Sequence, residues 1–83
     1  MNVHIKYRAK MAEFTKTAGE SIDAGNVKDV LRHIRVQFGA GAEKLARTML
    51  IVVNGQSILT LSHFKTTLKD GDEVAFLPIC GGG

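Results

Sequence analysis

The chain ends in Asp70-Gly71-Asp72-Glu73-Val74-Ala75-Phe76-Leu77-Pro78-Ile79-Cys80-Gly81-Gly82-Gly83. Asp70-Gly71 is a turn signal, and the apolar run that follows it predicts a strand up to Leu77. We therefore expect a folded domain over residues 1–77 and a flexible Gly-rich tail over residues 78–83. At about 3.4 Å per residue, this tail reaches at most roughly 20 Å from the domain.

The tail is the candidate working part of the protein. Glycine has no Cβ, so successive glycines suit a segment that threads a narrow channel. We expect Cys80, Gly81, Gly82 and Gly83 to thread such a channel, with the carboxylate of Gly83 at the far end. The alternative is a frayed terminus without a role, which is common for terminal glycines.

Other apolar patterns predict the strands and the main helix. Residues 3–7 alternate between apolar and polar side chains, as a half-buried strand does, and residues 49–53 form an apolar run that Asn54-Gly55 ends. Residues 20–23 give a weaker signal for a short strand. Residues 27–38 carry apolar side chains at helical spacing and predict one main helix.

Polar and glycine residues mark the ends of that helix and the connections around it. Asn26 is a candidate N-cap, and Gly39-Ala40-Gly41 is expected to end the helix. Residues 9–19 show little alternation and predict a turn region, and residues 42–47 allow a short helical turn. The order of elements predicts an α+β fold in which one main helix covers a mixed sheet of four to five strands.

Two of the predicted strands are apolar on both faces, although one helix covers only one face. If Val74 and Phe76 point inward, their neighbours point outward, and either Leu50 and Val52 or Ile51 and Val53 must do the same. An exposed apolar patch of this kind is typical of a protein interface. We expect a partner to contact the outward residues of the last strand and the start of the tail: Ala75, Leu77, Pro78 and Ile79. The alternative is that residues 57–68, which read as a short strand and a 3₁₀ connection, fold over part of that face.

Composition narrows the possible functions. The 83 residues make one small domain, with no apolar run near the length of a membrane span and no signal-peptide pattern, so we expect a cytoplasmic protein. The net charge is +3, but no aromatic nucleic-acid motif accompanies the basic clusters at Lys6–Lys10 and Lys28–Arg35. We expect no nucleic-acid partner, and instead a solvated basic face or one complementary to an acidic partner protein. The three histidines have no metal-ligand spacing, and the single cysteine allows no internal disulfide.

The C-terminal motif resembles a known family. The run from Asp70 to Pro78, followed by Gly82-Gly83, is similar to the end of the small subunit of molybdopterin synthase (MoaD), an ubiquitin-like sulfur carrier related to ThiS. Val52-Val53-Asn54-Gly55 and Leu68-Lys69-Asp70-Gly71-Asp72 resemble archaeal-type members. The resemblance implies the β-grasp fold of ubiquitin, with the first and last strands adjacent at the centre. Ile79 and Cys80 depart from the pattern, and Cys80 is either a small apolar stand-in or a reactive thiol.

The resemblance also implies the chemistry. Gly83 would be adenylylated with ATP by an ubiquitin-activating-like adenylyltransferase and converted to a thiocarboxylate by a sulfur donor such as a cysteine desulfurase or a rhodanese-like protein. The tail would then enter the large subunit of molybdopterin synthase and supply sulfur for the molybdenum cofactor. This scheme requires no catalytic side chain and no bound cofactor on the chain, which would be a carrier and co-substrate, not an enzyme.

Three alternatives use the same chain differently. An ubiquitin-like modifier would be joined through Gly83 to lysines of other proteins, and a related carrier would supply sulfur for thiamine or for tRNA thiolation. In a passive binding module, Gly82-Gly83 would be dispensable.

Overall fold

The computed structural model describes residues 1–79, in which helices and strands alternate along the chain. The elements in chain order are β1 (Asn2–Tyr7), α1 (Lys10–Thr15), β2 (Gly19–Asp23), α2 (Val27–Phe38), α3 (Ala40–Arg47), β3 (Leu50–Val53), β4 (Gln56–Ser57), two 3₁₀ turns, η1 (Ile58–Thr60) and η2 (His63–Lys65), and β5 (Glu73–Leu77).

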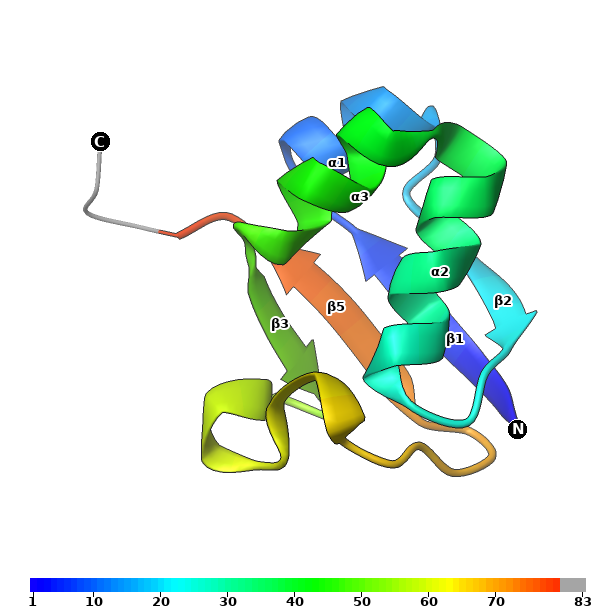
Figure 1. Cartoon of the computed structure of the whole chain (residues 1–83), viewed down its shortest axis with the longest axis vertical. Coiled ribbons are helices and arrows are strands. Elements are labelled where there is room, and N and C mark those ends of the chain that lie inside the picture. The colour runs from blue at the N-terminus through cyan, green and yellow to red at the C-terminus, as the bar shows by residue number, and fades with distance from the viewer. Residues whose placement is uncertain (80–83) are drawn as a thin grey trace.

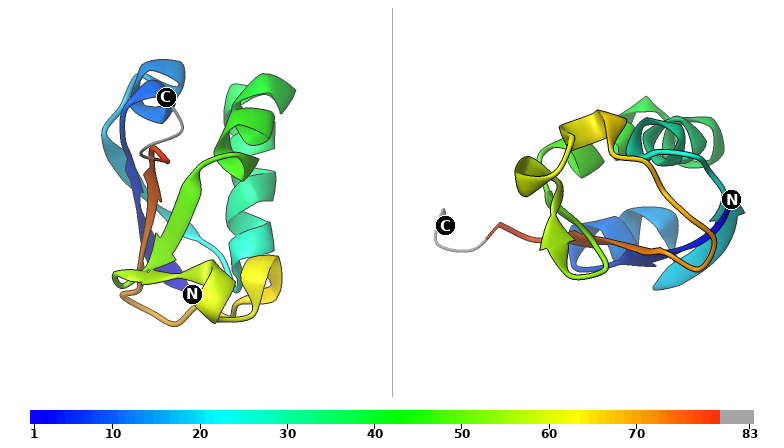
Figure 2. Two further views of the ribbon diagram at one scale, coloured as in Figure 1. Left: turned by 90° about the vertical axis from the view of Figure 1, so that its left-hand side faces the viewer. Right: turned by 90° about the horizontal axis from the view of Figure 1, so that it is seen from below.

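The five strands form one mixed sheet in the order β2-β1-β5-β3-β4. β1 and β5 are parallel and lie side by side at its centre, and the other neighbours are antiparallel. Figures 1 and 2 show α2 and α3 packed as a second layer over one face of this sheet. The predicted α+β architecture is confirmed, including the central pairing of the first and last strands.

The predicted main helix is confirmed at both ends. The Asn26 side chain accepts a hydrogen bond from the backbone N–H of Asp29 at 2.8 Å, which caps the first turn of α2. At the other end, the backbone of Gly39 has a φ of 99°, a conformation that residues with a Cβ rarely adopt. The apolar stripe of α2 faces the sheet, and its buried members are Val27, Val30, Leu31 and Ile34.

Two further helices correct the sequence interpretation. Residues 9–19 are not simply a turn region, because α1 lies within them and buries Met11 and Thr15. Thr15 donates its hydroxyl to the Met11 carbonyl at 2.9 Å, so the polar side chain is satisfied in the core. The predicted helical turn at residues 42–47 is a full helix, α3, which begins at Ala40, directly after Gly39. With so few buried positions, α1 lacks the apolar periodicity that reveals a helix.

The segment after β4 lies on the helix side of the sheet. Ile58 and Leu68 belong to the core, and the backbone N–H of Leu68 donates to the Gly25 carbonyl just before α2. Figure 2, right, shows η1 and η2 (yellow) on the side occupied by α2 and α3. The alternative that residues 57–68 cover the opposite face is therefore wrong. No helix or loop of residues 1–79 covers that face, which we call the open face.

Candidate functional site

The alternation of β5 decides which residues face the open side. Val74 and Phe76 are fully buried in the core, so Ala75 and Leu77 lie on the opposite face. β5 pairs with β3 so that Leu77 lies opposite Leu50 and Ala75 lies opposite Val52. Of the two alternatives for residues 49–53, Leu50 and Val52 are therefore the outward pair, and Ile51 and Val53 join the core.

These four outward residues form an apolar strip across the centre of the open face. Leu50, Val52 and Leu77 are half-buried, whereas Ala75 is only 8% exposed because its small side chain lies between neighbours on both adjacent strands. The predicted interface residue Ala75 thus offers little surface of its own, and Leu50 and Val52 supply most of the contact area beside Leu77.

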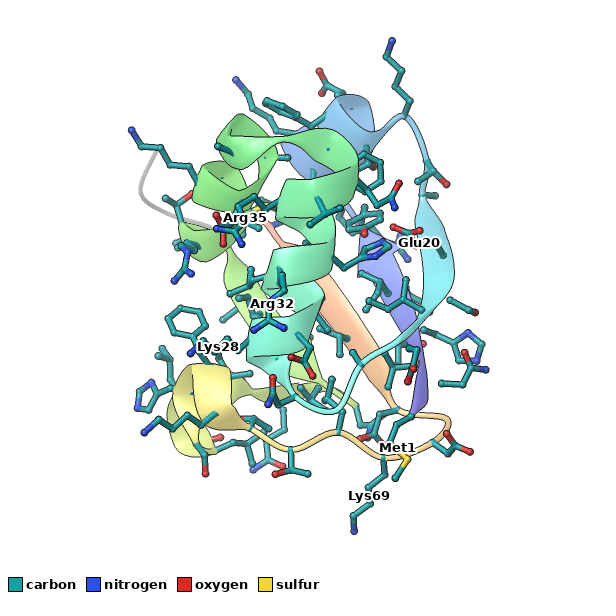
Figure 3. The ribbon with its side chains drawn as sticks, turned by 45° about the vertical axis from the view of Figure 1, so that its right-hand side comes forward. Met1, Glu20, Lys28, Arg32, Arg35 and Lys69 are labelled. Carbon is teal, nitrogen blue, oxygen red and sulfur yellow. The ribbon has the colours of Figure 1, made fainter. Side chains whose placement is uncertain are left out.

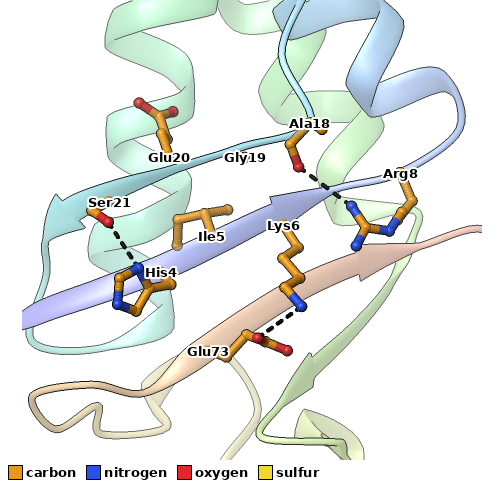
Figure 4. A pocket seen from close by; sticks show the side chains of 9 residues that line it. All are labelled: His4, Ile5, Lys6, Arg8, Ala18, Gly19, Glu20, Ser21 and Glu73. Atoms are coloured by element: carbon orange, nitrogen blue, oxygen red, sulfur yellow. Dashed lines mark hydrogen bonds and ion pairs between the residues drawn. The ribbon is translucent and has the colours of Figure 1, made fainter.

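The other half of the open face is polar (Figure 4). Lys6 pairs with Glu73 at 3.0 Å, the His4 ring shares a hydrogen bond with Ser21 at 2.8 Å, and an Arg8 Nη1 donates to the Ala18 carbonyl at 3.4 Å. The side chains line a shallow hollow but reach toward their strand neighbours, with no acid, base and nucleophile converging on one point. This hollow lacks the arrangement of a catalytic centre.

The start of β5 is fixed by the two turn motifs that the sequence singles out separately. The Asn54 side chain donates to Asp72 at 2.9 Å and accepts from the backbone N–H of Glu73 at 2.9 Å. Asp72 also accepts from the backbone N–H of Lys69 at 2.8 Å. The bonds from Asn54 and then Lys69 lower the pKa of Asp72 below its ordinary value. The Asn54-Gly55 turn therefore anchors β5 next to β3.

A partly buried polar network links the sheet to α2, and sequence reasoning missed it. The hydroxyl of Tyr7 donates to a carboxylate oxygen of Glu20 at 2.6 Å, and His33 Nε2 lies 3.1 Å from that oxygen. Burial of the Tyr7 ring, followed by the bond to Glu20, raises the pKa of Tyr7 above its ordinary value of 10.0. His33 is half-buried. No pattern in the sequence reports such a pairing, because its members come from three different elements.

The tail leaves the body at the end of β5. Pro78 and Ile79 are exposed, Ile79 to 64%, and Figure 1 shows residues 78–79 (red) running outward past the beginning of β3. The predicted reactive end, Cys80, Gly81, Gly82 and Gly83, lies outside the described residues. Its role stays a prediction.

Residues 1–79 were also searched for metal-binding groups and for membrane-spanning helices. No group of three or more His, Cys, Asp or Glu side chains there could hold a metal ion. Among the helices of the same range, none has the length and apolar character needed to cross a membrane.

Comparison with known proteins places the chain. A model of the ThiS family matches residues 5–83, which is nearly the whole chain. The chain belongs to the ThiS family. The resemblance to ubiquitin-like sulfur carriers is thereby confirmed, and the match runs through the glycines of the tail.

Relatives of this ThiS-family chain span its whole length. It is 28% identical to the molybdopterin synthase sulfur carrier subunit of Drosophila simulans, with 100% of this chain and 92% of that protein covered. The small archaeal modifier protein 1 of Methanosarcina acetivorans has a similar structure, with a TM-score of 0.85, 26% identity, and 99% and 96% of the two chains covered. A chain from the complex of subunits 1 and 2 of the molybdopterin-converting factor of Helicobacter pylori shares the fold, with a TM-score of 0.72, 23% identity and complete coverage of both chains.

Proposed function

We propose that this protein is a sulfur carrier of the molybdopterin-synthase small-subunit type, which transfers sulfur as a thiocarboxylate on Gly83. The observation that supports this most is the position of β5. It is a central strand held by β1 and β3, and it leads directly through exposed Pro78 and Ile79 into the Gly-rich end. The sheet thus fixes the position of the start of the tail, at Pro78 and Ile79, and partner proteins would act on the terminus.

The chemistry uses the terminal carboxylate and requires no side chain of the carrier. A carboxylate oxygen of Gly83 attacks the α-phosphate of ATP, which releases pyrophosphate and gives an acyl adenylate. A sulfur nucleophile then attacks the carbonyl carbon, and AMP leaves with the original oxygen. When the nucleophile is the persulfide of the donor protein, the product is an acyl disulfide, and a thiol then attacks the sulfur of the donor, which forms a disulfide and releases the thiocarboxylate. The resulting thiocarboxylate is ionised and nucleophilic, so it can pass its sulfur to an acceptor. Because activation consumes ATP, we place the carrier in the cytoplasm.

Three partners follow from this scheme. An adenylyltransferase activates Gly83, a cysteine desulfurase or rhodanese-like protein donates sulfur, and the large subunit of molybdopterin synthase encloses the tail. The open face supplies a docking surface, with Leu50, Val52 and Leu77 as its apolar centre. The Drosophila simulans relative is named as a sulfur carrier subunit, and the Helicobacter pylori structure is a complex of the two subunits of its factor. Both support this assignment.

Mass spectrometry tests the proposal directly. The chain is expressed with its activating enzyme and a sulfur donor, and its intact mass is measured. We expect an increase equal to the exchange of one oxygen for one sulfur, located at Gly83. Gly82→Ala should abolish the increase because a Cβ obstructs the threading channel, whereas Gly81→Ala is the matched control, since it adds the same methyl group one residue further from the reacting carboxylate. An unmodified wild-type mass under these conditions, with ATP consumed, counts against the carrier.

A second candidate is an ubiquitin-like modifier that ends as an isopeptide instead of a thiocarboxylate. It is favoured by the likeness to a small archaeal modifier protein, which has the higher TM-score of the two solved structures described above. Immunoblots of an N-terminally tagged chain separate the two. A ladder of conjugates that disappears on deletion of Gly82-Gly83 identifies a modifier, and a single free band identifies a carrier.

A further inference from the structure

The strongest feature outside the proposed site is a basic ridge on the helices. We define it as Lys28, Arg32 and Arg35 of α2 together with Arg47 of α3. Figure 3 shows the first three following one another along α2. With Glu43 these residues line one depression of about 140 Å³, and all four cations are exposed to solvent there.

The ridge holds a large share of the excess charge of the protein. Its four cations and Glu43 together carry three net positive charges, which equals the net charge of the whole chain. Asp29 lies 3.7 Å from Arg32 and Glu43 lies 3.4 Å from Arg47, but no ion pair among residues 1–79 involves Lys28 or Arg35. Like charges one turn apart destabilise a helix slightly, so the fold gains nothing from this arrangement.

An apolar pocket adjoins the ridge, and Arg47 belongs to both. Its guanidinium group lies 5.2 Å from the centre of the Phe64 ring, in cation–π contact, and forms one wall of a pocket of about 120 Å³. Leu50 and Phe64 contribute to the lining, and the strongly exposed Leu59 (67%) and Ile79 (64%) are also part of it. This volume is well below that of small-molecule sites, which start at about 300 Å³, and suits one aliphatic side chain.

The pocket is continuous with the root of the tail. β4 pairs only with Val52 and Val53, which leaves the edge of β3 at Leu50 and Ile51 unpaired, and the pocket lies at that edge. Ile79, two residues beyond the end of β5, is one of its walls. A group bound here therefore contacts both α3 and the start of the tail.

We propose that the ridge and the pocket form one docking surface for an acidic segment of a partner protein, which inserts one aliphatic side chain between Leu59 and Ile79 and presents carboxylates to the ridge. Three of the four cations are arginines, whose planar donors match carboxylates in pairs. A phosphodiester backbone has no aliphatic group that could fill the apolar pocket at the end of the ridge. The charge and the pocket together therefore favour a protein over a nucleic acid. This surface does not depend on the sulfur chemistry, because a modifier would use it as well.

The test is a titration of the ¹⁵N-labelled full chain with a synthetic peptide, followed by NMR. The probe carries a short run of glutamates followed by one leucine. We expect saturable shift changes confined to α2, α3, the start of β3, the segment from Ser57 to Lys65, and Ile79. Replacing the leucine of the peptide by alanine should weaken binding about tenfold, or about 1.4 kcal/mol, because less apolar surface is then buried in the pocket. Replacing its glutamates by lysines should abolish binding.

Matched charge reversals on the protein complete the experiment. The double variant Arg32→Glu/Arg35→Glu should weaken peptide binding at least tenfold, whereas Lys10→Glu/Lys16→Glu, an equal change on exposed residues of the α1 region, should leave it within about twofold. Leu59→Ser removes one exposed pocket residue and should reproduce the loss seen with the alanine peptide. Retained dispersion of the spectra confirms that each variant is folded.

Three results overturn the proposal. Shift changes that scatter over the whole surface, or an equal response of the two charge-reversal variants, would show only non-specific attraction. A single-stranded RNA that shifts the ridge residues more strongly than the peptide does would assign the surface to nucleic acid instead. None of these results bears on the thiocarboxylate of Gly83, so the two proposals fail separately.

Discussion

The two faces of β5 differ in their surroundings: one is buried in the core, and the other lies on the open side of the sheet. On the helix side, Val74 and Phe76 are fully buried in a core that β1, β3 and α2 complete. On the open side, Leu77 lies in an apolar strip that no helix or loop of residues 1–79 covers. Because strand residues alternate, one five-residue strand both stabilises the fold and presents the apolar strip that we propose as a docking surface. The two functions can therefore be altered separately by mutation.

The largest effect should come from the buried face. Phe76→Ala removes a fully buried ring that stacks against Tyr7, with a distance of 6.1 Å between the ring centres. We expect a loss of about 3–5 kcal/mol in the free energy of unfolding, measured by urea denaturation. Leu77→Ala, one residue along the same strand, is the matched control and should cost about 1 kcal/mol or less. Similar losses for the two variants would mean that the faces are not distinct.

The hydrogen bond from Tyr7 to Glu20 should make the free energy of unfolding depend on pH in alkaline solution. The pKa of Tyr7 is raised in the folded state above 10.0, so the unfolded chain releases this proton first as the pH rises. The stabilisation is complete below pH 10 and is lost above it, at a slope of at most about 1.4 kcal/mol per pH unit from this group. The measurement is a series of urea denaturations at increasing pH.

The control for this prediction is unusually direct. Tyr7 is the only tyrosine of the chain, so tyrosinate absorbance reports this one group. The absorbance should rise together with unfolding, and the stability of Tyr7→Phe should depend less steeply on pH. Tyrosinate that forms while the far-UV circular dichroism of the folded protein persists would contradict the buried hydrogen bond to Glu20.

A charge on the open face should affect binding far more than stability. Leu77→Asp places a carboxylate opposite Leu50 in the apolar strip. We expect a change of about 1 kcal/mol in the free energy of unfolding, but a loss of partner binding of tenfold or more, measured by calorimetry with the activating enzyme. If the mutation instead unfolds the protein, the assignment of Leu77 to the open face is wrong.

The contrast between the faces also explains which parts of the fold the sequence predicts. The strands of the sheet centre and α2 each bury one regular set of side chains, and their limits carry clear signals in Asn26, Gly39 and Asn54-Gly55. Alternation also limited the outward residues of β3 to two alternatives. Deciding between Leu50 and Ile51 required the register with β5, which is a tertiary fact.

The features that the sequence did not predict arise from contacts between distant segments. α1 has only Met11 and Thr15 buried, too few to show a period. The Tyr7–Glu20–His33 network depends on β1, β2 and α2 meeting at one place. The basic ridge was visible in part as the Lys28–Arg35 cluster, but Arg47 joins it only because α3 packs against α2. The chemistry of the tail was inferred from family resemblance, and residues 80–83 lie outside the described structure.

The smallest effect should come from the polar half of the open face. Lys6 and Glu73 form an ion pair at 3.0 Å, but both side chains are more than 40% exposed. Lys6→Gln should therefore change the free energy of unfolding by about 0.5 kcal/mol or less, and the change should shrink further in high salt. A double-mutant cycle with Glu73→Gln measures the pair itself. A coupling above about 1 kcal/mol would mean that the pair holds β1 and β5 together. A small coupling would mean that the fold does not depend on these two charges, because packing and backbone hydrogen bonds already hold β1 and β5 together.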